Sequence, residues 1–489
     1  MKKVFFLLML IIPILIFAQD EEPASNGLNM GGGIGTVLMG GETYSQIRLM
    51  PELVLGKFGL GLDIELLIDS EGNVREEDWD EFEDYVNKIY YLRYGQRGDS
   101  FFGKIGGFPY YTLGHGLIMK DYSNMLRYPQ VRQLGVQLGG KLPFAGLELE
   151  VFTSNITEND ILAGRVVAAP LKEMNLPIIS NIKFGATVVH DANQYNGLLD
   201  SDDDNYANVF DDFPDDEDYH NLVDYEIEFY QSLYEELFPD SSQSSFENWF
   251  YNSPTLNELR NPSMSELGEE GITVFGVDYE IPLLQTDLFF FSHYGELAQI
   301  VDHKMGFIFP GFYSKFLIFH MNLEFRMYQD DFMPAYFNNL YEEQRAVVYG
   351  DSVILKESLL DYTTESKGWY ASLTSDLFNV LKLTVSYEDM YGEDDENVKS
   401  LWGKLAFNNT FIPKLNIAEV NYSQTGFEKL KYFKTPSSLI EGKLGYTMSA
   451  NTVLVGTYQE RYVDLDGNGK IKGKDETIKT MNFGVEFRF

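Results

Sequence analysis

Apolar and polar residues alternate over long stretches of this chain, and this pattern limits the fold more than any other feature. It is clear in Leu60–Leu66, Leu147–Val151, Ile182–Val188, Leu317–Arg326 and Leu381–Glu388. Period-two alternation predicts β-strands with one apolar and one polar face. A soluble β-sandwich would show the same pattern. The strands, however, run for about 9–12 residues, which is the length that a tilted strand needs to cross a bilayer.

Composition excludes several classes of function. The 489 residues carry a formal net charge of −38 and include no cysteine. So negative a chain would repel phosphate, which excludes a general nucleic-acid binder. The lack of cysteine excludes a disulfide scaffold, a thiolate zinc site, an iron–sulfur cluster and a cysteine nucleophile. With 37 Phe and 32 Tyr, the chain is too aromatic for a disordered acidic protein.

The N-terminus has the features of a targeting segment. Lys2 and Lys3 form a basic region, and Val4–Phe17 is an apolar run that only Pro13 interrupts. This pattern predicts a secretory signal peptide over residues 1–18, with cleavage after Ala18. A transmembrane helix is the alternative, but an apolar run of ~14 residues falls short of the ~20 that a bilayer requires.

The C-terminus carries the most specific motif. Apolar residues occupy every second position back from the last residue: Phe483, Val485, Phe487 and Phe489. This ending resembles the β-signal on the last strand of bacterial outer-membrane β-barrels. The resemblance implies that the insertion machinery of the outer membrane recognises Phe489, and that the protein resides in the outer membrane of a diderm bacterium.

Links between the predicted strands alternate between short and long, as the periplasmic turns and outer loops of bacterial barrels do. Short turns are predicted at Gly56–Phe58, Gln96–Asp99, Leu142–Gly146, Lys172–Ser180, Pro282–Thr286, Phe312–Lys315, Leu377–Val380, Ile412–Lys414 and Ser449–Asn451. Outer links are predicted at 40–44, 69–87, 109–130, 155–160, 191–270, 295–303, 329–366, 392–397, 425–437 and 463–478. We therefore predict an all-β fold: one transmembrane antiparallel up-and-down barrel over residues 19–489, with an even number of strands, about 18–20.

Charged residues on the polar face of these strands are predicted to line the lumen, because a charge facing lipid costs about 2–4 kcal/mol near the midplane. The predicted lining residues are Asp63, Glu65, Arg93, Lys104, Glu148, Glu150, Lys183, Glu324, Arg326, Lys382, Glu388, Lys404, Glu441 and Lys443. A mixed polar lumen in a large barrel favours a water-filled channel. The alternative is a lumen closed by salt bridges and inward-folded loops.

Two outer links have features of their own. Segment 191–270 is long and acidic, and Asp224–Phe238 carries an apolar stripe at helical spacing, as does Arg75–Lys88. We expect surface loops with helical turns there. Gly114–Leu117, followed by Lys120–Asn124, is interpreted as a glycine-permitted bend at a strand end, with a loop folded into the channel as the alternative.

Two acidic segments have the spacing of calcium loops. Residues 464–475 resemble a loop of the EF-hand type, with oxygen ligands at Asp464, Asp466 and Asn468, the carbonyl of Lys470, and Asp475 at position 12. A hairpin turn without an ion is the alternative. The same 1, 3, 5, 12 spacing recurs at Asp200, Asp202, Asp204 and Asp211, with Asn205 at the usual glycine position. That second match is weaker, since acidic composition produces it easily.

These features favour a porin-like channel for passive diffusion of small polar solutes, with a mild preference for cations. The alternative function is a plugged barrel that acts as a surface receptor through calcium-stabilised acidic loops. An enzyme is not expected, because the chain contains no HExxH, GxSxG or phosphate-binding glycine motif. The expected partners are outer-membrane lipid, the insertion machinery and small polar solutes. An oligomer is left open.

Overall fold

The computed structural model describes residues 27–488 with internal gaps. The undescribed positions are 1–26, 40–41, 76–77, 80–81, 129–130, 157–159, 175, 203, 215, 217, 258, 261, 287, 350–351, 378–379, 393–396, 408–413, 428–432, 450–451, 465–470, 472–475 and 489. The predicted signal peptide lies outside the described residues. Within the described part of the chain, no helix is long and apolar enough to cross a membrane.

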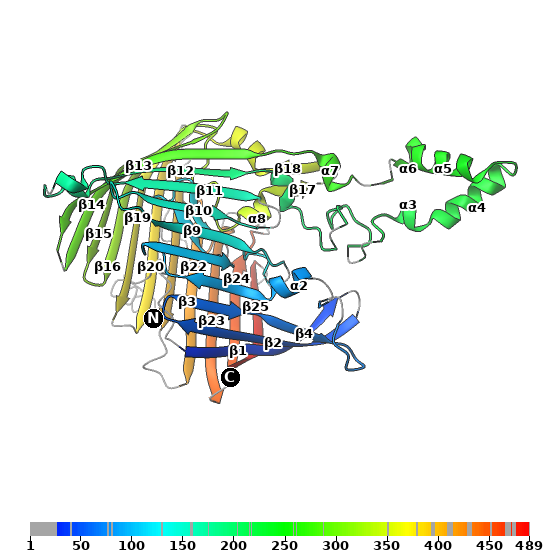
Figure 1. Cartoon of the computed structure of the whole chain (residues 1–489), viewed down its shortest axis with the longest axis horizontal. Coiled ribbons are helices and arrows are strands. Elements are labelled where there is room, and N and C mark those ends of the chain that lie inside the picture. Colours follow the sequence, from blue (N-terminus) through cyan, green and yellow to red (C-terminus); the bar gives the residue numbers. More distant parts are fainter. Residues whose placement is uncertain are drawn as a thin grey trace.

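Long antiparallel strands make up most of the molecule (Figure 1). Those of the main sheet are β1 (Gly27–Met39), β2 (Glu42–Leu55), β3 (Phe58–Leu62), β4 (Ile64–Ile68), β5 (Ile89–Tyr94), β6 (Phe101–Gly106), β9 (Gly135–Lys141), β10 (Glu148–Thr153), β11 (Ile161–Ala168), β12 (Lys183–Asp191), β13 (Ile272–Gln285), β14 (Phe289–Ile300), β15 (Met305–Phe316), β16 (Phe319–Tyr328), β19 (Ser366–Leu377), β20 (Leu381–Gly392), β21 (Asn397–Phe407), β22 (Leu415–Thr425), β23 (Ser438–Ser449), β24 (Thr452–Tyr462) and β25 (Thr477–Arg488). Two short hairpins lie in the links: β7 (Tyr111–Leu113) with β8 (Met119–Tyr122), and β17 (Ala346–Tyr349) with β18 (Ser352–Leu355).

The main sheet closes on itself. Each strand pairs with its neighbours in sequence, and β25 returns to pair with β1, where Gly32 lies opposite Phe487. The sheet contains 21 strands, but β3 and β4 pair with successive stretches of β2 and together make one crossing. The barrel thus has 20 crossings, and the predicted fold class and even strand number are confirmed.

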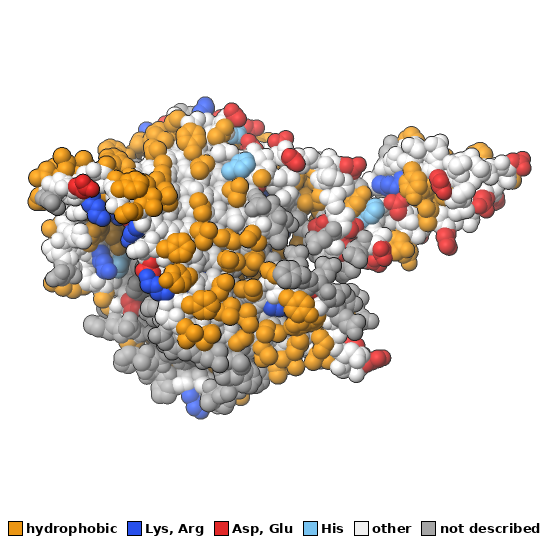
Figure 2. Space-filling model, in the orientation of Figure 1, with side chains coloured by type: hydrophobic (Ala, Val, Ile, Leu, Met, Phe, Trp, Pro, Cys, Tyr) orange, Lys and Arg blue, Asp and Glu red, His pale blue; other side chains and the backbone are white. Residues whose placement is uncertain are grey.

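The outer face of the barrel is apolar. Cross-strand neighbours such as Leu149 and Val166, or Val188 and Phe275, have exposed side chains on this face. Figure 2 shows hydrophobic side chains spread over the barrel surface. A closed barrel leaves no unpaired sheet edge, so an apolar exterior of this kind is compatible with lipid.

Three predicted links are misplaced. Pro282–Gln285 lies within β13 and Gly295–Ile300 lies within β14, so both of these links come later than predicted. The third is wrong as a whole. Phe312–Lys315 lies within β15, and the turn comes later, between Phe316 and Phe319. Just before this segment, Pro310 and Gly311 lie at a register shift between β15 and β16, and proline is tolerated at such bulges because it has no ladder hydrogen bond to donate there.

The outer links carry the helices, as predicted for 224–238 and 75–88. These are α2 (Phe82–Asn87), α3 (Leu222–Tyr225), α4 (Ile227–Leu237), α5 (Gln243–Asn252), α6 (Pro254–Asn257), α7 (Met264–Leu267) and α8 (Tyr341–Gln344), with the 3-10 turns η3 (Gln194–Gly197) and η4 (Lys356–Tyr362). The 3-10 turns η1 (Lys172–Met174) and η2 (Ile179–Asn181) lie instead in the link between β11 and β12, which was predicted as a short turn. Helices α3–α6 form an arm that projects from the end of the barrel where β17, β18 and α8 lie (Figure 1). The arm has a small core of its own around Val223, Phe246, Phe250 and Leu256.

Candidate functional site: the barrel lumen

Two outer links fold into the barrel and form its main apolar core. We call them the inward loops, residues 107–134 and residues 329–365. Leu113, Met119 and Tyr122 of the first loop and Phe337 of the second are almost fully buried in one cluster. The backbones of the two loops also bond to each other, since the Lys120 amide donates to the Phe337 carbonyl at 3.0 Å. For 114–124, the alternative interpretation is therefore correct: this segment is a loop folded into the barrel.

A row of apolar residues on the inner face of the wall receives these loops. Cross-strand partners place Phe152, Ala163, Val189, Val274 and Ile300 side by side from β10 to β14. All five are buried in the same cluster as the inward loops. The lumen is therefore apolar on this side, which the sequence analysis did not predict.

Glycine permits a close approach between the first inward loop and the wall. Gly114 has a φ of +63°, and a Cβ added there would collide with the Glu296 carboxylate. Glu296 accepts a hydrogen bond from the Leu117 amide at 3.1 Å. The neighbouring His115 ring stacks on Tyr294 with 4.0 Å between ring centroids. Backbone conformation and polar contacts thus fix the loop against β14.

A buried charge cluster fastens the second inward loop. Arg345 is fully buried and pairs with Asp160 at 2.9 Å, Glu342 at 3.0 Å and Asp191 at 3.4 Å. Tyr341 donates a hydrogen bond to Asp191 at 2.8 Å. Asp160 belongs to the 154–160 link, Asp191 is the last residue of β12, and Glu342 lies in α8. One guanidinium therefore joins three parts of the outer rim. A fully buried guanidinium is tolerated only where carboxylates pair with it, as these three do.

A second charge network lies on the inner wall of β16 to β20. Arg326 contacts Glu324 at 2.5 Å and Glu388 at 2.7 Å, and its guanidinium lies 3.7 Å from the Tyr370 ring centroid. Lys120 of the first inward loop reaches the Tyr370 hydroxyl at 3.4 Å. The structure thus brings three of the predicted lining residues together in one pairing.

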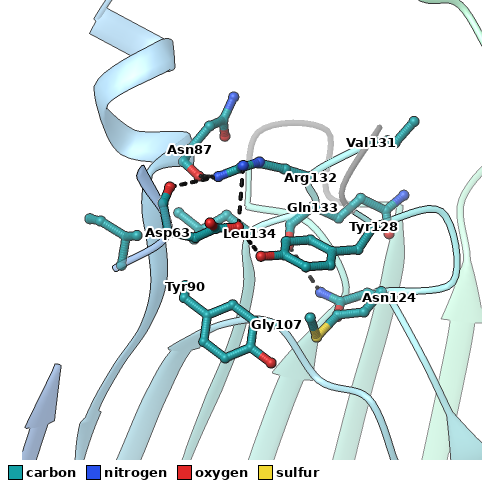
Figure 3. Close-up of a pocket in the computed structure, with 12 residues that line it drawn as sticks. Asp63, Asn87, Tyr90, Gly107, Asn124, Tyr128, Val131, Arg132, Gln133 and Leu134 are labelled. Atoms are coloured by element: carbon teal, nitrogen blue, oxygen red, sulfur yellow. Dashed lines mark hydrogen bonds and ion pairs between the residues drawn. The ribbon is translucent and has the colours of Figure 1, made fainter. Parts of the chain in front are cut away.

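A third network surrounds a small pocket of about 20 Å³ near β4 and β5 (Figure 3). Asp63, which is fully buried, pairs with Arg48 at 2.5 Å and Arg132 at 3.2 Å and accepts a hydrogen bond from Tyr128. Glu65 lies 3.6 Å from Arg132. This polar group holds the end of the first inward loop against the wall.

The opposite wall is polar and carries a larger cavity. Eight residues on the inner face of β22 to β25 form a continuous cross-strand stripe: Glu419, Asn421, Glu441, Lys443, Thr457, Gln459, Thr480 and Asn482. They line a hollow of about 290 Å³. Among the described residues, β21–β25 contribute no side chain to the apolar core of the inward loops. We call this wall the polar stripe.

The remaining predicted lining residues are spread over the wall. Glu150 pairs with Arg97 at 2.9 Å, and Lys404 pairs with Glu419 at 3.1 Å. Arg93 and Lys104 are partners across β5 and β6. Glu148, Lys183 and Lys382 lie at strand ends that follow the short turns.

The predicted calcium ligands fall into two groups. The structure brings Asp200, Asp202 and Asp204 together. In the other loop Asp464 is described, whereas Asp466, Asn468, Lys470 and Asp475 lie outside the described residues. In the predicted β-signal the side chain of Phe483 is 75% exposed on the outer face, and Phe489 lies outside the described residues.

Sequence reasoning missed the Arg345 cluster altogether. Asp160, Asp191 and Glu342 are three acids among 75 in the chain, so none is distinctive. The usable signal was Arg345 itself, since bases are scarce in so acidic a chain and the link 329–366 contains only Arg345 and Lys356.

Comparisons with known proteins concern the fold. No protein-family model and no curated protein matches the chain. Solved structures with a similar arrangement include OccK11 (OpdR) of Pseudomonas aeruginosa (11% identity, 94% of each chain covered, TM-score 0.33). The ferric enterobactin receptor PfeA of the same organism is also similar, with 8% identity, 95% of this chain and 74% of that chain covered, and a TM-score of 0.38. A third is Wzi of Escherichia coli, an outer-membrane carbohydrate-binding β-barrel, with 9% identity, 94% of this chain and 83% of that chain covered, and a TM-score of 0.30.

Structural similarity at these TM-scores carries no argument. The assignment of the chain to the outer membrane rests on the molecule itself. The sheet is closed by β1 and β25, the outer face is apolar, and charged networks face inward. Only helices and closed barrels satisfy backbone hydrogen bonds within a bilayer, and even-stranded antiparallel barrels with long outer loops are the outer-membrane form. The chain is an outer-membrane β-barrel of 20 crossings whose lumen is partly filled by its own outer loops.

Proposed function

We propose that this protein is an outer-membrane channel through which small polar solutes diffuse along the polar stripe. The observation that carries this proposal is the hollow of about 290 Å³ on β22 to β25, lined by carboxylate, amide, hydroxyl and ammonium groups. Such groups can replace the hydration of a polar solute while it passes. No catalytic step is part of the proposal.

The inward loops support a narrow path with a fixed position. They pack on β10 to β16 and on β20, and the Arg345 and Arg326 networks hold them there. A solute would then pass beside the loops, between them and the polar stripe. In this arrangement the loops set the width of the channel and the stripe sets its chemistry.

Planar-bilayer recording of the purified full chain tests the proposal. We expect single-channel conductance in wild type, and a clear fall in that conductance for Thr457→Trp, because a large ring would fill the hollow. Met481→Trp on the neighbouring strand is the matched control, since Met481 is 60% exposed on the outer face. Its conductance should equal that of wild type.

A plugged barrel that acts as a surface receptor is the alternative function. The continuous apolar core between the inward loops and the wall favours it. A silent wild type that inserts fully would overturn the channel proposal and favour the receptor. Equal conductance in wild type and Thr457→Trp would contradict the path along the polar stripe.

A further inference from the structure

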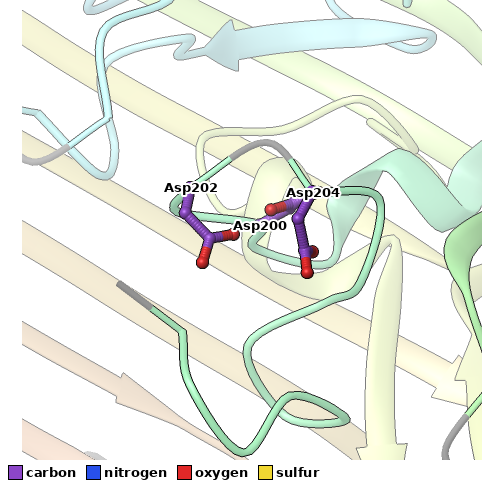
Figure 4. Close-up of side chains that lie close together, drawn as sticks. All are labelled: Asp200, Asp202 and Asp204. Carbon is purple, nitrogen blue, oxygen red and sulfur yellow. The ribbon is translucent and has the colours of Figure 1, made fainter. Parts of the chain in front are cut away.

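The acidic segment 200–211 lies where the chain leaves the barrel end for the arm. Ligand atoms of Asp200, Asp202 and Asp204 all lie within 4.8 Å of one another (Figure 4). Like charges this close repel one another unless a cation neutralises them. An acidic cluster is common on proteins without an ion, so proximity does not identify a site.

Buried oxygen atoms without hydrogen-bond donors provide an independent observation. The Asp204 side chain is only 4% exposed. Its Oδ1 accepts a hydrogen bond from the Tyr206 amide at 2.8 Å, whereas its Oδ2 accepts none from the described residues. Both carboxylate oxygens of Asp202, the Oδ2 of Asp211 and the Oδ1 of Asn208 are likewise buried without a donor. A buried carboxylate oxygen without a donor costs free energy, and a bound cation would remove that cost for this group of oxygens.

These oxygens follow the order of a calcium loop. With Asp200 as position 1 of a twelve-residue loop, Asp202, Asp204, Asn208 and Asp211 hold positions 3, 5, 9 and 12. In an EF-hand loop these positions supply side-chain or water-mediated ligands. Position 6, which requires a sharp turn, is Asn205, whose φ is +74°. Asn208 was not among the sequence-predicted ligands.

One histidine faces the cluster from outside the loop. The nearest cation recorded for Asp204 is His220, whose Nδ1 lies 3.8 Å from Oδ2, beyond hydrogen-bond reach. All the candidate ligand atoms are oxygens, which a hard divalent cation prefers.

We propose that residues 200–211 bind one calcium ion through the carboxylates of Asp200, Asp202, Asp204 and Asp211, with Asn208 at position 9. This site goes beyond the proposed channel function and does not depend on it.

The site would fix the base of the arm. Ala207 and Phe210, inside the loop, are buried against Leu198 and Ala346 at the barrel end. Asn205 bonds to the returning leg of the link, since its carbonyl accepts from the Met264 amide at 2.8 Å. A cation in this loop therefore joins the two legs of the arm at the point where they meet the barrel.

Terbium luminescence and calcium titration on the full chain in detergent test the site. Tyr206 lies at position 7, so terbium bound in the loop should emit on excitation of tyrosine, and calcium should quench that emission by displacement. Asp202→Asn/Asp204→Asn should lose one equivalent of bound calcium relative to wild type. Glu235→Gln/Glu236→Gln on α4 removes the same charge from the same arm and should bind like wild type.

Chymotrypsin provides a second measurement, whose central comparison uses wild type alone. In wild type, calcium but not magnesium should protect the bonds after Tyr206 and Phe210 against cleavage, and a chelator should remove the protection. Asp464→Asn/Asp466→Asn should keep this protection, because the other predicted loop is separate. Cleavage of wild type that is equal with calcium and with chelator would overturn the site, as would unchanged calcium stoichiometry in Asp202→Asn/Asp204→Asn.

Discussion

Single buried charges hold the outer loops of this barrel in place. Arg345 is surrounded by three carboxylates and has no exposed surface. Removal of one partner from a buried ion pair typically costs about 3–5 kcal/mol, because the other charges remain buried without a counter-ion. The pKa of Arg345 is raised by its three acidic neighbours, although burial alone would lower it, so it stays charged at any accessible pH.

We therefore predict that Arg345→Ala releases the second inward loop while the barrel stays folded. Chymotrypsin should cleave 329–365 in the variant far faster than in wild type, by a factor on the order of 10² or more if about 3 kcal/mol is lost. Lys304→Ala is the matched control. Lys304 and Asp330 are 3.7 Å apart and about half exposed, and such a pair contributes little. Equal protection of the loop in wild type and Arg345→Ala would contradict this role.

Strands and loops differ in how far the sequence could predict them. The bilayer forces every strand to present apolar residues to lipid at period two, so Leu149 and Val166 could be placed on the outer face from sequence. Phe152 and Val189 face inward only because two loops cover them. Gly114–Asn124 has no periodic pattern, and its burial depends on long-range contacts with Glu296 and Phe337, which one sequence does not reveal.

The second inward loop should pack more firmly as pH rises from 8 toward 10. Lys356 is buried with its Nζ donating to the Tyr336 carbonyl at 2.8 Å, and burial lowers its pKa from 10.5 to about 8. Between these values the released loop binds a proton that the packed loop does not, so the packed state gains stability as pH rises, by at most roughly 3 kcal/mol. Below pH 8 the ammonium is charged in both states, and the burial penalty is constant.

Chymotrypsin cleavage of 329–365 across pH 7 to 10, corrected for the pH dependence of the enzyme, measures this effect. Wild type should become more resistant with rising pH. Lys356→Met, which has a similar length and no charge, should show no such change. A wild-type profile that is flat, or that loses protection as pH rises, would refute the assignment to Lys356.

The whole molecule combines a barrel wall of nearly balanced charge with very acidic outer loops. The predicted lining residues include as many bases as acids, whereas the chain as a whole carries a net charge of −38. Much of the excess of acidic over basic residues lies in the arm and its base, and Figure 2 shows acidic side chains gathered there. A negative field at the outer mouth concentrates cations and repels anions, and dissolved salt screens it over about 10 Å at 0.1 M.

We therefore predict a mild cation preference that originates at the outer mouth. In reversal-potential measurements, cation preference should be greatest in dilute potassium chloride and should fall as salt rises. Replacement of residues 222–257 by a short glycine–serine linker should weaken it further, because those helices form a separate core and the barrel does not need them. Glu235→Gln/Glu236→Gln should produce a smaller change in the same direction. Anion selectivity in dilute salt would instead mean that lumen bases such as Arg93, Arg326 and Lys382 control passage, and the protein would then suit acidic solutes.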